Sequence, residues 1–146
     1  MADTSRARLV VFQVADLCCA LPVETVREII PAQVATRIPG APDAIDGLIN
    51  VRGNLLTVAR GSTVLRRVQT EAGGERSVLV LALEGRAVGL EVDDVLDMVD
   101  VAESELSPAE RLPGIDPSLA RSVGRYGNRV FIVLDPGALV APLVGG

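Results

Sequence analysis

The chain has 146 residues, of which 49% are hydrophobic and 23% are charged. This length and composition predict a single domain with a sizeable core and exclude a disordered chain. The formal net charge is -5, and the 14 basic residues are all arginine. Nucleic-acid binding is not expected, because phosphate neutralisation needs a basic face and the chain has no arginine cluster beyond Arg66-Arg67.

Histidine is absent, which removes the commonest general base, the commonest metal ligand and any phosphorylatable histidine. The two cysteines, Cys18 and Cys19, are adjacent, and neighbours on a strand point to opposite faces. They are therefore expected to be free, buried or half-buried thiols in a reducing cytoplasm. The sequence contains neither a membrane-spanning run nor the pattern of a secretory signal, so a cytoplasmic protein without membrane insertion is expected.

The N-terminal segment predicts a hairpin followed by a short helix. The two strands cover residues 8–14 and 17–21, around a turn at Ala15-Asp16. The proline that follows is favourable at the first position of a helix, and apolar residues then recur at helical spacing, so a helix is predicted over residues 23–30. Glu28, on the wetter side of this helix, has three open interpretations: a catalytic acid, a partner for an arginine or a solvated charge.

Residues 47–58 contain the most informative pattern, two short apolar runs folded about an Arg-Gly-Asn corner. A two-residue turn is predicted at Gly53-Asn54, because glycine accepts positive φ at no steric cost, and this turn places Arg52 opposite Leu55. Alternation assigns one face to the core: Ile49, Val51, Leu56 and Val58. The opposite face mixes polar and apolar groups: Leu48, Asn50, Arg52, Leu55 and Thr57. That mixture is typical of a protein contact surface, although a guanidinium at a hairpin end can also simply stay wet.

The rest of the chain consists mainly of short apolar runs between glycine, proline and asparagine corners, the pattern of strands and tight turns. The predicted strands cover residues 77–83, 86–92, 95–101, 120–126 and 129–134. Short helical turns are predicted at residues 63–67 and 136–140, and a flexible polar loop at 70–75. Nine or ten short strands in all suit a barrel or a pair of small barrels, where closure removes exposed edges.

No constellation in the sequence indicates catalysis, a cofactor or a metal. Asp93-Asp94 is the nearest approach to a carboxylate pair, but its position at a strand end favours a turn in which aspartate binds local backbone N–H groups. The glycines between Gly85 and Gly89 lack the strand-to-helix context of a phosphate-binding loop. A small enzyme or ligand carrier would need polar groups that converge in a pocket, and the sequence offers mostly strand-end carboxylates.

Several motifs, taken together and in order, resemble the CheW family of chemotaxis coupling proteins. The most specific combination is Val26-Arg27-Glu28-Ile29 followed by Gly47-Leu48-Ile49-Asn50-Val51-Arg52-Gly53. Ile38-Pro39, Val88-Gly89-Leu90-Glu91-Val92-Asp93 and Val133-Leu134-Asp135 agree with it. The resemblance extends from about Leu9 to Leu139.

The resemblance implies a mainly β fold: two small five-stranded β-barrels packed on a shared hydrophobic core, with a few short helices. It places a single CheW-like domain at residues 7–142, with flexible termini at 1–6 and 143–146. Members of this family are non-enzymatic adaptors. They link the cytoplasmic tip of methyl-accepting chemoreceptors to the regulatory domain of the histidine kinase CheA.

The resemblance also implies the positions of protein-binding residues. Arg52, Asn50 and Gly53 lie in the family's characteristic hairpin, and Val26 and Glu28 lie near a receptor-facing groove between the barrels. Val88 and Leu90 lie on a strand of the second barrel near the kinase contact.

One segment departs from the family pattern. After the hairpin the family usually continues with Asp-Leu-Arg, whereas this chain has Val58-Ala59-Arg60-Gly61. Two functions therefore stay open. The chain is either a full coupling protein, or a divergent accessory protein that binds the receptor, or competes for array positions, without engaging the kinase.

Overall fold

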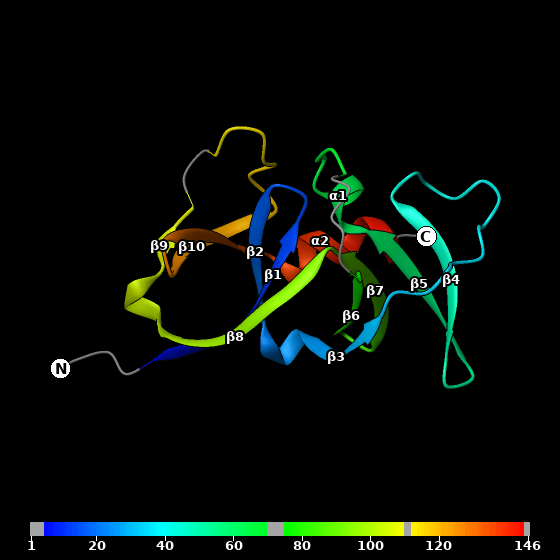
Figure 1. The fold of residues 1–146 in the computed structure, drawn as a ribbon, viewed down its shortest axis with the longest axis horizontal. Coiled ribbons are helices and arrows are strands. Elements are labelled where there is room, and N and C mark those ends of the chain that lie inside the picture. The colour runs from blue at the N-terminus through cyan, green and yellow to red at the C-terminus, as the bar shows by residue number, and fades with distance from the viewer. Residues whose placement is uncertain (1–4, 70–74, 110–111, 145–146) are drawn as a thin grey trace.

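The computed structural model describes residues 5–69, 75–109 and 112–144 of the chain. Most of the predicted polar loop at 70–75 and the outer parts of the predicted flexible termini lie outside these residues. Within them, the strands divide between two sheets that lie side by side in Figure 1.

The first sheet has six strands in the order β8-β1-β2-β11-β10-β9. Their bounds are β8 (Asp94–Ala102), β1 (Arg6–Val14), β2 (Leu17–Pro22), β11 (Arg129–Leu134), β10 (Ala120–Tyr126) and β9 (Ser107–Pro108). Neighbours pair antiparallel except β2 and β11, which are parallel. The outer strands β8 and β9 follow one another in the chain, joined by the 3₁₀ turn η2 (Glu103–Glu105).

The second sheet has five strands in the order β3-β6-β7-β5-β4. Their bounds are β3 (Val26–Pro31), β6 (Ser77–Leu83), β7 (Arg86–Val92), β5 (Asn54–Arg60) and β4 (Ile45–Val51). Only β5 and β7 pair in parallel. Here too the outer strands, β3 and β4, are neighbours in the chain.

Three apolar clusters explain this arrangement. One lies inside the first sheet and includes Leu9, Val11 and Phe131, and another lies inside the second sheet and includes Ile49 and Val58. The largest lies between the sheets and combines alternate residues of both, such as Phe12 and Leu90. Helix α2 (Pro136–Val144) contributes to this shared cluster and lies between the sheets in Figure 1.

The expected barrels are not closed by continuous ladders. In the second sheet no ladder joins the outer strands β3 and β4 among the described residues, and an isolated bridge ties the segment between them to β4. In this bridge Thr36 and Leu48 exchange N–H···O bonds of 2.8 and 2.9 Å. In the first sheet Tyr126 Oη on β10 donates to Asp97 Oδ2 on β8 over 3.4 Å. The expectation of two strand units on a shared core is confirmed, whereas that of two closed five-stranded barrels is corrected to a six-stranded and a five-stranded open sheet.

The helix predicted over residues 23–30 is wrong. Only Val23–Thr25 forms a 3₁₀ turn, η1, and the chain then enters β3. Val26, Ile29 and Ile30 are β-branched, and a strand lets Ile29 pack into the shared cluster while Ile30 packs inside the second sheet. Over only eight residues the apolar spacing fits both the helical period and the strand period. Packing against the two clusters selects the strand.

Most other predicted elements agree closely with the structure. The predicted strands 77–83, 86–92, 120–126 and 129–134 have the bounds of β6, β7, β10 and β11. Cys18 and Cys19 are free and buried, as expected, and burial raises the pKa of both thiols. The predicted turn of helix at 63–67 is α1 (Gly61–Val64), slightly earlier, and β9 was not predicted.

Candidate protein-interaction site

The β4–β5 hairpin turns one residue earlier than predicted. Arg52 and Gly53 form the turn, with φ of 50° and 85°, and Val51 pairs with Asn54. The Asn50 side-chain oxygen accepts the Gly53 N–H at 2.8 Å, which stabilises this register. Each cross-strand pair shifts by two residues, so the predicted faces survive although Asn50, and not Arg52, is opposite Leu55.

The outward face of the hairpin has the predicted mixed character. Ile49, Leu56 and Val58 are buried inside the second sheet, whereas Leu55 is 71% exposed. Asn50 is also exposed and lies directly across from Leu55. An amide beside an exposed leucine gives the end of the hairpin both a polar and an apolar contact.

Arg52 and Glu28 are brought together although they are separated by 24 positions in the chain. Arg52 Nη2 lies 2.5 Å from Glu28 Oε1 and 2.6 Å from Oε2. Glu28 lies on β3 and Arg52 at the end of β4, so the ion pair crosses the open seam between the two outer strands of the second sheet. Of the three interpretations of Glu28, the arginine partner is the one that this geometry shows.

The other candidate residues occupy different environments. Val26 is half-buried and packs against the shared cluster beside the bulge that precedes Glu28. Val88 and Leu90 are 1% and 0% exposed in that cluster. Their side chains therefore cannot touch a partner directly. They pack in the shared cluster and fix the position of β7.

The segment that departs from the family pattern is divided between core and surface. Ala59 is fully buried at the end of β5, so its side chain contributes no contact. Arg60 is exposed, and its Nη2 lies 2.7 Å from Asp46 Oδ1. The surface at this position thus carries an arginine held by an aspartate.

A group of buried and half-buried polar residues was not predicted; we call it the Asp93 network, and it comprises Asp93, Ser62, Gln69 and Arg76. Asp93 Oδ2 accepts the Ala15 N–H at 2.7 Å, and Oδ1 accepts Gln69 Nε2 at 2.9 Å and lies 3.4 Å from Arg76 Nε. The Gln69 side-chain oxygen also accepts a hydrogen bond from the Ser62 hydroxyl. The predicted role of Asp93 in a local turn is therefore wrong: its carboxylate binds a backbone N–H 78 positions away and ties the β1–β2 turn to the end of β7.

Glu91 adjoins this network and has a raised pKa. Burial is the main cause, and the nearby carboxylates of Asp46 and Asp93 add to it, while Arg60 and Arg76 oppose it. Arg76 Nη1 lies 3.9 Å from Glu91 Oε1. The described residues contain no group of three or more histidine, cysteine, aspartate or glutamate side chains with metal-ligand geometry. No helix in the described part of the chain is long and apolar enough to cross a membrane.

Comparisons with known proteins agree with this geometry. The family model described as a CheW-like domain matches residues 8–143. The chemotaxis protein CheW of Rhizobium meliloti is 32% identical over 128 residues, which cover 87% of this chain and 83% of the relative. The chemotaxis protein CheW of Bacillus subtilis is 28% identical over 134 residues, covering 91% and 86%.

A solved structure shows the same fold. It is the scaffolding protein TtCheW from Thermoanaerobacter tengcongensis, which superposes with a TM-score of 0.82 at 22% sequence identity and covers 91% of this chain and 86% of that one. The two open sheets on a shared core are therefore the fold of that scaffolding protein. With a family model across nearly all of its length, the chain belongs to the CheW-like family.

Proposed function

We propose that the chain is a non-enzymatic adaptor of a chemosensory pathway that couples the cytoplasmic tip of a methyl-accepting chemoreceptor to the regulatory domain of a CheA-type histidine kinase. The names of its relatives, chemotaxis and scaffolding proteins, support this function. The structural observation that carries it is the Arg52–Glu28 ion pair beside the exposed Leu55. Both partners are cytoplasmic, and so in this proposal is the adaptor.

The Arg52 guanidinium is both oriented and accessible. Its side chain is 70% exposed, and Nη2 alone contacts Glu28. The remaining N–H groups stay available to a partner carboxylate or carbonyl. Because an arginine fixed in this way loses less conformational entropy on binding, it is a suitable anchor at the centre of a contact.

The proposed receptor contact surrounds this anchor. Glu28 and Val26 contribute from β3, and Asn50 and Gly53 from the hairpin. Charge at such a surface directs the partner and fixes its register, while the adjoining apolar groups supply buried area. The kinase contact is proposed on the second sheet, where Val88 and Leu90 fix the position of β7 from inside the core.

Binding of the two partners by the purified chain tests the proposal. Size-exclusion chromatography of the chain with a soluble receptor-tip fragment and the kinase regulatory domain is expected to give a ternary complex. Arg52→Glu is expected to weaken receptor binding by about tenfold or more, since it replaces attraction by repulsion. The matched control is Arg125→Glu on β10, which removes another exposed arginine far along the chain from the hairpin. Equal weakening by both variants, or binding of neither partner by the wild-type chain, contradicts the proposal.

The second candidate function is an accessory protein that binds the receptor without engaging the kinase. The segment Ala59-Arg60 favours it, because the family resemblance led us to expect Asp-Leu-Arg after the hairpin. The structure instead has a buried alanine and an arginine paired with Asp46. On this hypothesis the wild-type chain binds only the receptor fragment, and Arg60→Asp gains kinase binding. Asp46→Ala is the control, since it breaks the same ion pair without introducing a carboxylate at position 60. Wild-type binding to the kinase domain excludes this second function.

A further inference from the structure

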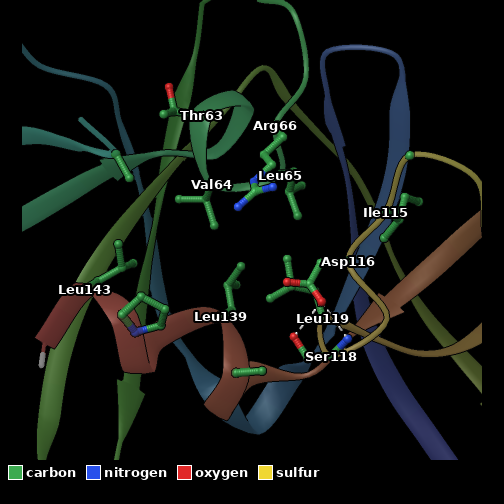
Figure 2. A pocket seen from close by; sticks show the side chains of 14 residues that line it. Thr63, Val64, Leu65, Arg66, Ile115, Asp116, Ser118, Leu119, Leu139 and Leu143 are labelled. Carbon is green, nitrogen blue, oxygen red and sulfur yellow. Dashed lines mark hydrogen bonds between the residues drawn. The ribbon is translucent and has the colours of Figure 1, made fainter. Parts of the chain in front are cut away.

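A cleft lies on a part of the molecule that the proposed contacts do not use. It has a volume of about 680 Å³ and is bounded by α1, α2 and the segment 112–119. Figure 2 shows side chains from all three pointing toward one hollow. Since α1 follows the second sheet and α2 follows the first, an occupant would touch both halves of the domain.

The floor of the cleft is aliphatic. Leu139 of α2 and Leu65 after α1 are 0% and 4% exposed and belong to the shared cluster. Val64 and Leu119 are half-buried and pack against the same cluster. Such a surface favours an apolar ligand, because an apolar group that covers these aliphatic side chains is removed from water. The side chains themselves are held in place by the shared cluster.

The rim carries one cation and one anion on different walls. Arg66 has a left-handed backbone, with φ of 55°, and Figure 2 shows its guanidinium directed into the hollow. Its backbone N–H donates to the Thr63 carbonyl at 3.1 Å, and its charge lies close enough to the facing wall to help lower the pKa of Asp116. Asp116 lies on the facing wall, where Ser118 donates to Oδ1 through both its N–H (2.9 Å) and its hydroxyl (2.8 Å). These bonds lower the pKa of Asp116, so its carboxylate is charged at neutral pH.

Hydrogen bonds fix the walls before any ligand arrives. Arg67 binds both carboxylate oxygens of Asp16 and also donates to the Gly114 carbonyl at 3.4 Å, which joins the α1 wall to the 112–119 wall. The Leu119 N–H donates to the Asp116 carbonyl at 2.9 Å. The left-handed backbone of Arg66 ends α1, where the Arg67 N–H donates to the Ser62 carbonyl at 2.7 Å.

We propose that this cleft binds a short apolar peptide with free termini, its carboxylate on Arg66, its ammonium group on Asp116 and its aliphatic side chains over Leu139 and Leu65. The paired charges on opposite walls select a zwitterion over a simple fatty acid or amine, each of which satisfies one wall and leaves the other unpaired. The volume is in the range of small-molecule sites and exceeds what one aliphatic amino acid fills.

The probe for this proposal is the dipeptide Leu-Leu, titrated into the ¹⁵N-labelled full chain and followed by NMR. Amide shifts are expected to be confined to α1, α2 and residues 112–119. N-acetyl-Leu-Leu and Leu-Leu-amide each remove one terminal charge from the same apolar body, and each is expected to bind about tenfold more weakly. Free leucine is expected to bind more weakly than the dipeptide.

Three variants assign the contacts. Arg66→Gln is expected to abolish the preference for a free carboxylate while keeping that for the ammonium group, and Asp116→Asn to do the converse while its side-chain oxygen still accepts from Ser118. Ala138→Phe, which fills the cleft from α2, is expected to abolish binding without any change of charge. The proposal is overturned by equal affinity for free and capped peptides, by free leucine binding as tightly as Leu-Leu, or by shifts spread over other surfaces.

Discussion

Two groups of charged residues in this molecule differ in their position and burial. The Arg52–Glu28 pair crosses the seam of the second sheet at the surface, with Arg52 70% exposed. The Asp93 network lies at the junction of the two sheets, where Asp93 is only 7% exposed and accepts a backbone N–H from the β1–β2 turn. The Arg52 side chain is open to solvent, whereas the Asp93 carboxylate is buried.

The difference separates a buried group that stabilises the fold from an exposed ion pair that we propose to act in recognition. An exposed ion pair contributes about 0–1 kcal/mol because solvent screens it. Removal of a buried carboxylate that accepts hydrogen bonds costs more stability, because its donors are left unsatisfied. The domain can therefore expose the Arg52–Glu28 pair, our proposed contact, while the buried Asp93 carboxylate ties the β1–β2 turn to the end of β7.

The largest expected effect on stability comes from Asp93→Ala. It leaves the Ala15 N–H and the Gln69 amide without their acceptor and removes a carboxylate from Arg76, so a loss of about 3 kcal/mol of unfolding free energy is expected. Urea denaturation followed by circular dichroism measures this loss. The control is Asp94→Ala at the exposed neighbouring position, with an expected loss below about 0.5 kcal/mol. Similar losses for the two variants would remove the distinction between buried and exposed charge.

A smaller effect is expected when the Thr36–Leu48 bridge between the β3–β4 connection and β4 is disturbed. Gly47 has a φ of 151°, and a Cβ there would lie 2.3 Å from the Thr36 carbonyl oxygen, which accepts one of the two bridging hydrogen bonds. Gly47→Ala is expected to cost about 2 kcal/mol. Gly53→Ala, where φ is 85° but the space is open, isolates the backbone term and should cost about 1 kcal/mol. If Gly53→Ala proved the more costly, the Thr36–Leu48 bridge would not make the expected contribution to stability.

The pH dependence of Glu91→Gln sharpens the comparison further. Burial raises the pKa of Glu91 in the folded chain above its ordinary value of 4.5, so ionised Glu91 opposes folding at neutral pH. As the pH falls through the raised pKa toward 4.5, the folded chain gains a proton that the unfolded chain does not yet hold, and this group contributes more stability. Glu91→Gln is therefore expected to be more stable than the wild type at pH 7, with an advantage that shrinks as the pH falls. Glu24→Gln, at an exposed position, is the control, and an advantage of Glu91→Gln that grew toward low pH would contradict the assigned cause.

Sequence patterns predicted the strands best where burial was continuous. The run 77–83 is apolar at both parities, and β6 is indeed covered on both faces by two separate clusters. Prediction failed at residues 23–30, where apolar spacing fits a helix and a strand alike. The hairpin register also failed, because the bond from the Gly53 N–H to the Asn50 side chain, and not glycine preference alone, fixes the turn.

The candidate site was predicted only in part. Arg52 and Glu28 were identified separately, but their contact depends on how the second sheet curls, which no local pattern specifies. Val88 and Leu90 were placed near a contact although both are core residues. The Asp93 network was missed because its principal partner, the Ala15 N–H, is distant in sequence and belongs to the backbone.

The most direct test of the account is a paired measurement on Arg52→Glu: its unfolding free energy and its affinity for a chemoreceptor-tip fragment by isothermal titration calorimetry. The account predicts that stability changes by about 1 kcal/mol or less, whereas affinity falls by about tenfold or more. Loss of stability comparable to that of Asp93→Ala, or unchanged receptor affinity, would show that the Arg52–Glu28 pair maintains the fold rather than a contact surface.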